Sequence, residues 1–171
     1  YMQALGIIWG DTDPLARGED GVLTCLEEPV HFGAKLLLSD WEAKHEAGGF
    51  RVGRDLPSRA LSTVLRNLVV CEPIDGGQDY RARVAGSALM RRFHRDITGM
   101  TMSQLLAPED YIWQRDAIAE MFKTNRPFGL EVAPKKARVN TLHYETWCLP
   151  VIAESGAAWV LAGIFYHDWV G

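Results

Sequence analysis

The sequence has too few cysteines for a disulfide framework. It contains three in 171 residues, Cys25, Cys71 and Cys148, and no two of them form a Cys-x-x-Cys metal pair. Cys71 and Cys148 lie in apolar runs, where a small buried thiol is the expected role. An odd number of widely spaced cysteines favours a protein of the reducing cytosol.

Long hydrophobic runs are also absent, although hydrophobic residues make up 47% of the chain. Residues 2–9 are apolar, but this segment is short and has no basic leader, so it fits neither a membrane span nor a signal peptide. Charged residues make up 23%, an ordinary fraction for a globular protein. We therefore expect a soluble, cytoplasmic protein without a membrane partner.

A strong net charge is missing as well. The formal net charge is -4 at pH 7, which argues against nucleic acid as a partner. Residues 91–95, Arg-Arg-Phe-His-Arg, form a local basic run. A solvated helix face explains this run better than a phosphate-binding patch does.

Catalytic motifs are absent too. The five histidines are scattered, without His-x-x-x-His or His-Glu-x-x-His spacing, and there is no Gly-x-Ser-x-Gly segment. Glu109 and Asp110 fall at a predicted helix start, where the helix dipole explains paired acids. His143 and Glu145 share one face of a predicted strand and fit a cross-strand polar pair better than a metal site. We expect a protein that is not an enzyme and binds no metal.

The first predicted element is a helix over residues 29–47. Pro29 suits a first helical position, and Gly48 and Gly49 form a stop signal. Apolar residues recur along it at helical spacing, so one face has to be buried. These residues are Phe32, Leu36, Leu37 and Trp41.

Five β-rich segments follow. Residues 67–72 and 80–86 flank a turn sequence, which predicts an antiparallel hairpin. Residues 128–137, 142–152 and 157–167 are joined by short turns, which predicts an antiparallel meander.

Three helices are predicted between these two groups of strands. Ser87 is placed to cap a short one, and residues 103–106 form a single turn. Pro108 begins a longer helix that ends near Asn125.

The last predicted strand is apolar on both of its alternating faces. Trp159 and Leu161 lie on one face, and Val160 and Ile164 lie on the other. Such a strand belongs to a sheet that is covered on both sides. The helices of residues 87–125 can cover one side, and the leading helix or a second subunit can cover the other.

The order of these elements resembles that of a PAS domain. Between residues 36 and 168 the chain is similar to a bacterial PAS subfamily of small sensor-like proteins common in alphaproteobacteria. Besides Trp41, the similar segments are Gly48-Gly49, Leu56-Pro57-Ser58-Arg59, Arg81-Ala82-Arg83-Val84-Ala85-Gly86-Ser87, Arg95-Asp96-Ile97-Thr98-Gly99 and Leu149-Pro150-Val151.

The resemblance implies an α+β fold. A five-stranded antiparallel sheet would carry short helices on one face and an N-terminal helix capping the other. Residues 1–28 would then be an N-terminal extension, residues 29–66 the leading helix and loop, and residues 67–168 the PAS core. The resemblance also implies a homodimer formed through the N-terminal helix, whose interface candidates are Phe32, Leu36, Leu37 and Trp41.

No cofactor follows from the resemblance. Haem-binding PAS domains commonly carry an axial histidine on the long helix, and residues 108–125 contain no histidine. Photosensory flavin PAS domains carry Asn-Cys-Arg after the second strand, where residues 88–92 read Ala-Leu-Met-Arg-Arg. Haem and a flavin photocycle are therefore not expected. Non-covalent flavin and a small metabolite stay open.

A ligand would lie between the sheet and the helices, in an apolar pocket with few polar groups. Arg83 and Ser87 are the polar candidates, and a buried Arg83 would need either a ligand carboxylate or Asp96 as its partner. The other candidates are Met90, Phe93, Met102, Tyr111, Phe122, Trp147, Leu149, Trp159 and Leu161. A filled core is the alternative interpretation of the same residues.

Two functions are consistent with this sequence. The first is a stand-alone PAS sensory or regulatory module that dimerises, binds a small metabolite in its core and signals to a partner protein in trans. The alternative is a ligand-free protein–protein interaction adaptor. Ligand bound to the purified protein favours the first, and a filled interior with a large apolar dimer interface favours the second.

Overall fold

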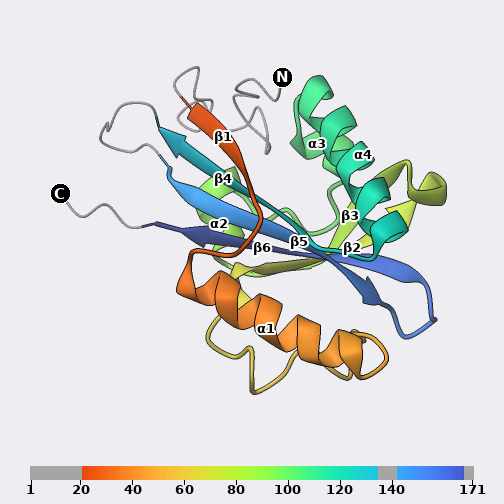
Figure 1. The fold of residues 1–171 in the computed structure, drawn as a ribbon. Helices are drawn as coiled ribbons and strands as arrows, with labels where there is room; N and C mark the ends of the chain where they lie inside the picture. Colours follow the sequence, from red (N-terminus) through yellow and green to blue (C-terminus); the bar gives the residue numbers. More distant parts are fainter. Residues whose placement is uncertain (1–20, 135–141, 168–171) are drawn as a thin grey trace.

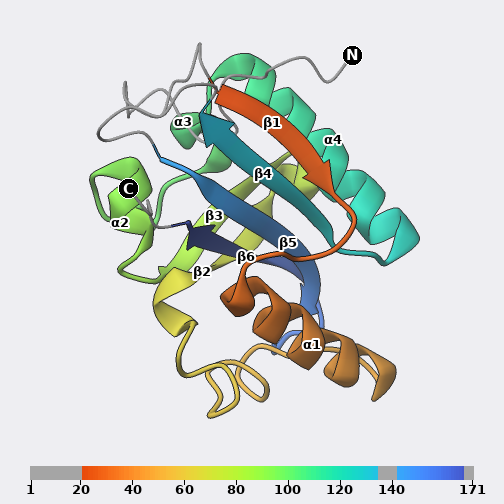
Figure 2. The same ribbon diagram turned by 60° about the vertical axis from the view of Figure 1, so that its left-hand side comes forward.

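A twisted antiparallel sheet of six strands forms the middle of the molecule (Figures 1 and 2). The computed structural model describes residues 21–134 and 142–167. Within them the strand order is β1-β4-β5-β6-β2-β3. The strands are β1 (Gly21–Leu26), β2 (Leu68–Ile74), β3 (Asp79–Ala85), β4 (Phe128–Pro134), β5 (Tyr144–Ile152) and β6 (Ala158–Tyr166).

Helices cover both faces of this sheet (Figures 1 and 2). One face carries α1 (Phe32–Glu46). The other carries α2 (Leu89–Phe93), α3 (Met102–Leu105) and α4 (Pro108–Thr124). The expected α+β fold, with the leading helix opposite the short helices, is therefore confirmed.

Strands β5 and β6 are apolar on both sides because both sides are covered. Residues 144–151 are all buried, and so are residues 160–165. Successive side chains of a strand point to opposite faces, so one set of each strand packs toward α1 and the other toward α2, α3 and α4. The interpretation of residues 157–167 as a strand covered on both sides is confirmed.

The sheet has one strand more than the five expected. β1 pairs with β4 along its whole length, from Gly21 opposite Pro134 to Leu26 opposite Gly129. The six residues of β1 show too short a pattern to predict a strand by themselves. Their partner lies more than 100 residues later in the chain, and local sequence signals do not report so distant a pairing.

The starts of two helices differ from the expectations. α1 is capped by His31, whose Nδ1 accepts a hydrogen bond from the Gly33 N–H at 2.9 Å, so Pro29 precedes the helix and is not its first residue. The N-cap of α2 is Ala88, without a capping side chain, so Ser87 is not the cap. The Ala88 N–H instead donates to the Arg66 carbonyl at 2.9 Å, just before β2, which positions this segment through the backbone.

The starts of α3 and α4 follow familiar rules. Thr101 and Gln104 form a reciprocal capping box at α3. α4 begins with Pro108 and ends before Asn125, which takes the left-handed conformation at φ 56°. The predicted helix from Pro108 to Asn125 is therefore confirmed.

Candidate functional site

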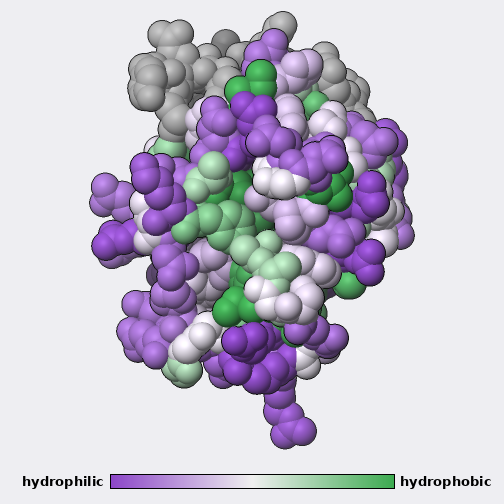
Figure 3. Space-filling model, turned by 90° about the vertical axis from the view of Figure 1, so that its right-hand side faces the viewer, coloured by the Kyte–Doolittle hydropathy of each residue, from purple (hydrophilic) through white to green (hydrophobic). Residues whose placement is uncertain are grey.

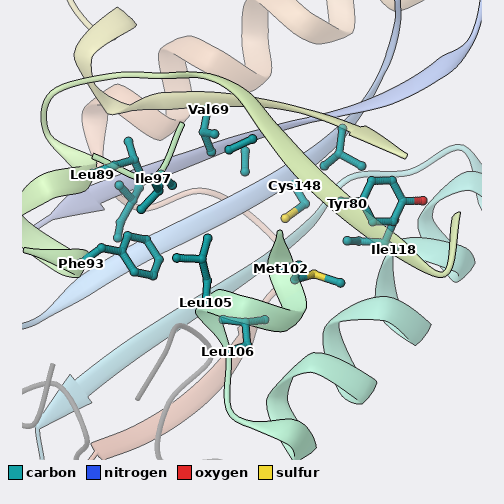
Figure 4. Close-up of a cluster of buried hydrophobic side chains, with 14 of the residues drawn as sticks. Val69, Tyr80, Leu89, Phe93, Ile97, Met102, Leu105, Leu106, Ile118 and Cys148 are labelled. Atoms are coloured by element: carbon teal, nitrogen blue, oxygen red, sulfur yellow. The ribbon is translucent and has the colours of Figure 1, made fainter. Parts of the chain in front are cut away.

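Buried side chains form two clusters, one on each face of the sheet. We call the cluster beneath α2, α3 and α4 the inner core (Figure 4) and the cluster beneath α1 the outer core. Members of the inner core include Val69, Tyr80, Leu89, Phe93, Ile97, Met102, Leu105, Leu106, Ile118 and Cys148. Members of the outer core include Leu37, Trp41, Leu61, Trp147, Leu149 and Leu161.

The inner core contains a cavity of about 30 Å³. A space of this size holds one or two water molecules or a methyl-sized group. No side chain in its lining belongs to a charged residue type, so the cavity suits a small, uncharged and mostly apolar group. The lining is Val69, Cys71, Tyr80, Ala82, Ile97, Met100, Met102, Leu105, Gln114, Ile118, Cys148, Val160 and Ala162.

Gln114 is the amide in this lining. Its side chain is buried on the sheet-facing side of α4, and its Nε2 donates to Cys148 Sγ at 3.5 Å. Its Oε1 is buried and has no hydrogen-bond partner in the part of the chain that the structure describes. A buried acceptor left unpaired costs about 1–3 kcal/mol, so this oxygen favours a partner that enters the cavity.

Two thiols also line the cavity, and both are protonated at neutral pH. Burial raises the pKa of Cys71 to about 12. Burial and the nearby Cys71 raise the pKa of Cys148 as well, although the hydrogen bond from Gln114 opposes this shift. The two strands that carry them flank β6, which separates them by about 10 Å, too far for a disulfide. The thiols therefore contribute apolar lining rather than a nucleophile.

A buried arginine lies on α2, outside the cavity lining. Arg92 is fully buried, and its Nε donates to Tyr144 Oη at 3.3 Å. Asp110, in the first turn of α4, is buried as well. Its burial and the neighbouring Glu109 raise its pKa to about 6, against the opposing effect of Arg92. The expectation that residues 91–95 form a solvated helix face is wrong at Arg92, because α2 packs this side of its single turn onto the sheet.

The predicted pocket residues on the helices have different positions. Those in the inner core or packed against it are Phe93, Met102, Tyr111 and Phe122. Of these four, Met102 lines the cavity. Met90 is 48% exposed and Ser87 is exposed, so neither side chain is positioned to contact a ligand in the cavity.

Four predicted pocket residues of the sheet lie on its other face. Trp147, Leu149, Trp159 and Leu161 lie in the outer core or pack against it. The expectation that they share a pocket with the helices is wrong, since the alternate residues Cys148, Val160 and Ala162 face the inner core. The sequence of a strand that is apolar on both faces shows which residues share a face, but it does not show which helices that face packs against.

Arg83 is exposed rather than buried. Its side chain is 56% exposed and lies 3.4 Å from Glu72 across the β2–β3 hairpin. Asp96, the alternative partner, instead accepts hydrogen bonds from the Thr98 amide and hydroxyl, and these bonds lower the pKa of its carboxyl group. The expectation of a buried Arg83 at the ligand is therefore wrong. A solvated arginine has no need of a buried anion.

The leading helix covers the outer core of its own chain. Leu37 is fully buried and Trp41 is 5% exposed, and Trp41 Nε1 donates to the Pro150 carbonyl at 2.8 Å. Leu36 is partly buried, whereas Phe32 is 70% exposed. Of the four predicted interface residues, Leu37 and Trp41 thus belong to the intramolecular contact, and Phe32 stays accessible.

A buried carboxylate fastens the start of α1 to the sheet. Glu145 on β5 is fully buried and accepts hydrogen bonds from Val30 N–H at 2.9 Å, His31 N–H at 2.7 Å and Trp147 Nε1–H at 2.7 Å. His167 Nε2 lies 3.8 Å from the same carboxylate. Sequence reasoning missed this contact because Glu145 was interpreted only as a member of a polar pair.

His143 pairs across strands with Glu131 on β4, with 3.1 Å between His143 Nε2 and Glu131 Oε1. The centre of its ring lies 4.4 Å from that of His167.

Within residues 21–134 and 142–167, no group of three or more histidine, cysteine, aspartate or glutamate side chains is arranged to hold a metal ion. Over the same residues, no helix combines the length and the hydrophobicity of a membrane span.

Comparison with known proteins agrees with this architecture. A family model described as a PAS domain matches residues 31–166, about four fifths of the chain. No curated protein and no solved structure gives a match. The matched region begins at the cap of α1 and ends at the last residue of β6, so it contains both cores. The protein therefore belongs to the PAS domain family, whose members are sensory and regulatory modules.

Proposed function

We propose that this PAS domain is a sensor that binds a small uncharged molecule in the cavity of the inner core. The observation that supports this most directly is Gln114, a residue in the lining of an otherwise largely apolar cavity, whose buried Oε1 lacks a partner among the described residues. A ligand that donates one hydrogen bond to this oxygen and buries a small apolar body satisfies both features.

A typical metabolite is larger than the cavity, so its lining has to move when the ligand binds. Met102 is the first residue of α3 and Met100 lies two residues before it, so both are outside the strands. Methionine side chains are unbranched and change rotamer easily. Their displacement enlarges the cavity without breaking a strand pairing.

Strands β5 and β6 offer a route from the cavity to α1. Cys148 and Val160 line the cavity, while the adjacent residues Leu149 and Leu161 contact the outer core beneath α1. Because both sets belong to the same two strands, a ligand that shifts the strands also changes the packing of α1. We therefore propose α1 as the element that passes ligand occupancy to a partner protein in trans.

The proposed homodimer contact is the exposed start of α1. Phe32 is 70% exposed and Val30 is 56% exposed. Two large apolar side chains this close together on a surface are a candidate protein contact. Leu37 and Trp41 support the helix from beneath rather than facing the partner.

A second candidate function is a ligand-free interaction adaptor. Figure 3 shows a band of hydrophobic side chains, bordered by hydrophilic ones, on the side of the molecule where α4 and the end of α1 approach each other. A surface hollow of about 320 Å³ lies between the ends of these helices, with Phe50, Phe122 and Ile152 in its lining. A partner that inserts an apolar side chain there needs no ligand in the inner core.

Native mass spectrometry of freshly purified protein tests these alternatives. For a sensor we expect a mass above that of the polypeptide, and we expect Ala162→Leu to abolish it, because Ala162 lines the cavity and the change adds three carbon atoms. Ala119→Leu, on an exposed position of α4, is the matched control and should keep the ligand.

A bare polypeptide mass in the wild type, with no thermal stabilisation by a panel of small uncharged hydrogen-bond donors, would contradict the sensor. In that case the adaptor is favoured, and Phe122→Glu should abolish capture of a partner at the hollow.

A further inference from the structure

Arg92 is a buried cation whose charge is only partly compensated. Its side chain is fully buried, and Nε donates to Tyr144 Oη at 3.3 Å. Nη1 and Nη2 are buried and have no hydrogen-bond partner among residues 21–134 and 142–167. A guanidinium cannot lose its proton in a protein, so these N–H groups require an acceptor.

Two aromatic rings and one carboxylate surround this guanidinium. Its carbon atom lies 5.2 Å from the centre of the Phe93 ring and 5.7 Å from the centre of the Tyr144 ring. Such cation–π contacts are worth about 0.5–2 kcal/mol each, less than the cost of a buried unpaired charge. Asp110 is close enough for Arg92 to lower its pKa, yet neither Nη1 nor Nη2 donates a hydrogen bond to it.

The beginning of α4 adds positive potential beside Arg92. Asp110 is the third residue of this 17-residue helix, and the N-cap Ala107 supplies no side-chain acceptor to the first-turn amides. The amino end of a helix carries partial positive charge. The surroundings of Asp110 thus combine a guanidinium and a helix end with the neighbouring carboxylate of Glu109.

We propose that Arg92 binds the carboxylate of a small monocarboxylic acid, enclosed by α2, the first turn of α4 and Tyr144. The two Nη groups form a planar fork that matches the two oxygens of a carboxylate. Full burial penalises a dianion such as phosphate, and Asp110 repels a second negative charge. The rings of Phe93 and Tyr144 supply apolar surface beside the guanidinium for a short hydrocarbon chain.

This site is separate from the one proposed for the uncharged ligand. Neither Arg92 nor Tyr144 lines the cavity of the inner core. Asp110 and Gln114 lie one helical turn apart on the buried side of α4, so the same helix contacts both sites.

Thermal unfolding in sodium propionate, compared with sodium chloride at equal ionic strength, tests the proposal. We expect saturating propionate to raise the melting temperature of the wild type by about 5 °C or more. Arg92→Met keeps an unbranched side chain but removes the guanidinium and its charge, so it should abolish this rise. Arg83→Met removes an exposed arginine and should leave the rise unchanged.

Asp110→Asn is the second variant. It removes the carboxylate that repels the ligand. We therefore expect the propionate concentration that gives half of the maximal rise to be lower than in the wild type. If Arg92 and Asp110 are only an internal pair, Asp110→Asn instead lowers the melting temperature and no protein responds to propionate. That result would overturn the proposal.

Two further outcomes would also overturn it. One is a propionate response that persists in Arg92→Met. The other is a larger response to inorganic phosphate than to propionate, which would exclude the monocarboxylate.

Should Arg92→Met fail to fold, Tyr144→Phe, which removes the hydroxyl bonded to Nε, is expected to weaken the propionate response. Ala162→Leu, which fills the cavity, should keep this response, so failure of one proposal leaves the other testable.

Discussion

Glu145 shows how much one side chain can determine in this fold. Its carboxylate has no exposed surface and accepts three N–H groups, two of them from the residues that immediately precede α1. Hydrogen bonds to a charged acceptor are worth about 1.5–3 kcal/mol each before the cost of burial. The carboxylate therefore sets where the leading helix starts on the sheet.

We expect Glu145→Gln to lower the free energy of unfolding by about 2 kcal/mol or more, because an amide nitrogen cannot accept these hydrogen bonds. Urea unfolding measures this. Glu72→Gln is the matched control, since the Glu72 side chain pairs with the exposed Arg83, and its effect should stay below about 1 kcal/mol. Equal losses in the two variants would contradict the role assigned to Glu145.

His167 makes stability depend on pH in a predictable direction. Burial is the main cause of its lowered pKa; His143 and His31 act in the same direction, and Glu145 and Glu131 oppose them. Because the folded-state pKa lies below the ordinary 6.5, the unfolded chain binds the proton more readily. Stability should thus be lost as pH falls from about 6.5 toward the folded-state pKa.

The measurement is chemical unfolding of the wild type and of His167→Gln between pH 5 and 8. Asp110 acts in the opposite sense, since its raised pKa makes the folded state bind a proton below about pH 6. The difference between the two proteins isolates His167. An identical pH dependence in both would refute this prediction.

At the scale of elements, α1 has a supporting side and an accessible side. Trp41 lies beneath it in the outer core and donates to Pro150 on β5. Phe32 lies on the accessible side. The same helix can therefore stabilise the fold and offer a contact surface through different residues.

We expect Trp41→Ala to lower the free energy of unfolding by about 3–5 kcal/mol, through the cavity it leaves. Phe32→Ala should change stability by about 0.5 kcal/mol or less, while shifting the proposed dimer toward monomer. Urea unfolding and sedimentation velocity separate the two effects. A dimer that persists in Phe32→Ala would refute Phe32 as the contact.

How far the elements were predictable depends on how local their signals are. The helix of residues 108–125 and the strands of the last third have strong local patterns, and the structure contains them. β1 has a distant partner and was missed. The candidate site is less predictable: Trp147 and Leu149 lie on the opposite face from the one expected, Arg83 is exposed, and Arg92, expected on a solvated helix face, is buried. When a strand is apolar on both sides, residue spacing alone does not tell which set of side chains faces which core. Spacing also does not tell which side of a one-turn helix packs onto the sheet.

At the scale of the whole molecule, the two cores share their central strands. β5 supplies Cys148 to the inner core and Leu149 to the outer core, and β6 supplies Val160 and Leu161 in the same way. Loss of packing in one core removes support from strands that the other core also needs. The domain is therefore expected to unfold as one cooperative unit.

Tryptophan fluorescence and far-ultraviolet circular dichroism test this during urea unfolding. Trp41 and Trp147 lie in the outer core and Trp113 packs against the inner core, so fluorescence follows side-chain packing in both cores, and circular dichroism follows the secondary structure. We expect coincident transitions in the wild type and in Ile118→Ala, which weakens the inner core alone. Separate transitions would indicate that the two cores unfold independently.

The strand order also has a consequence for the order of events during synthesis. β1 leaves the ribosome first, but its partner β4 is translated about 100 residues later, a delay on the order of ten seconds. α1 waits longer still, because the strands that it covers, β5 and β6, are the last to be made. The apolar side of the leading helix thus stays uncovered until nearly the whole domain has been translated, and the nascent chain exposes an aggregation-prone surface during that time.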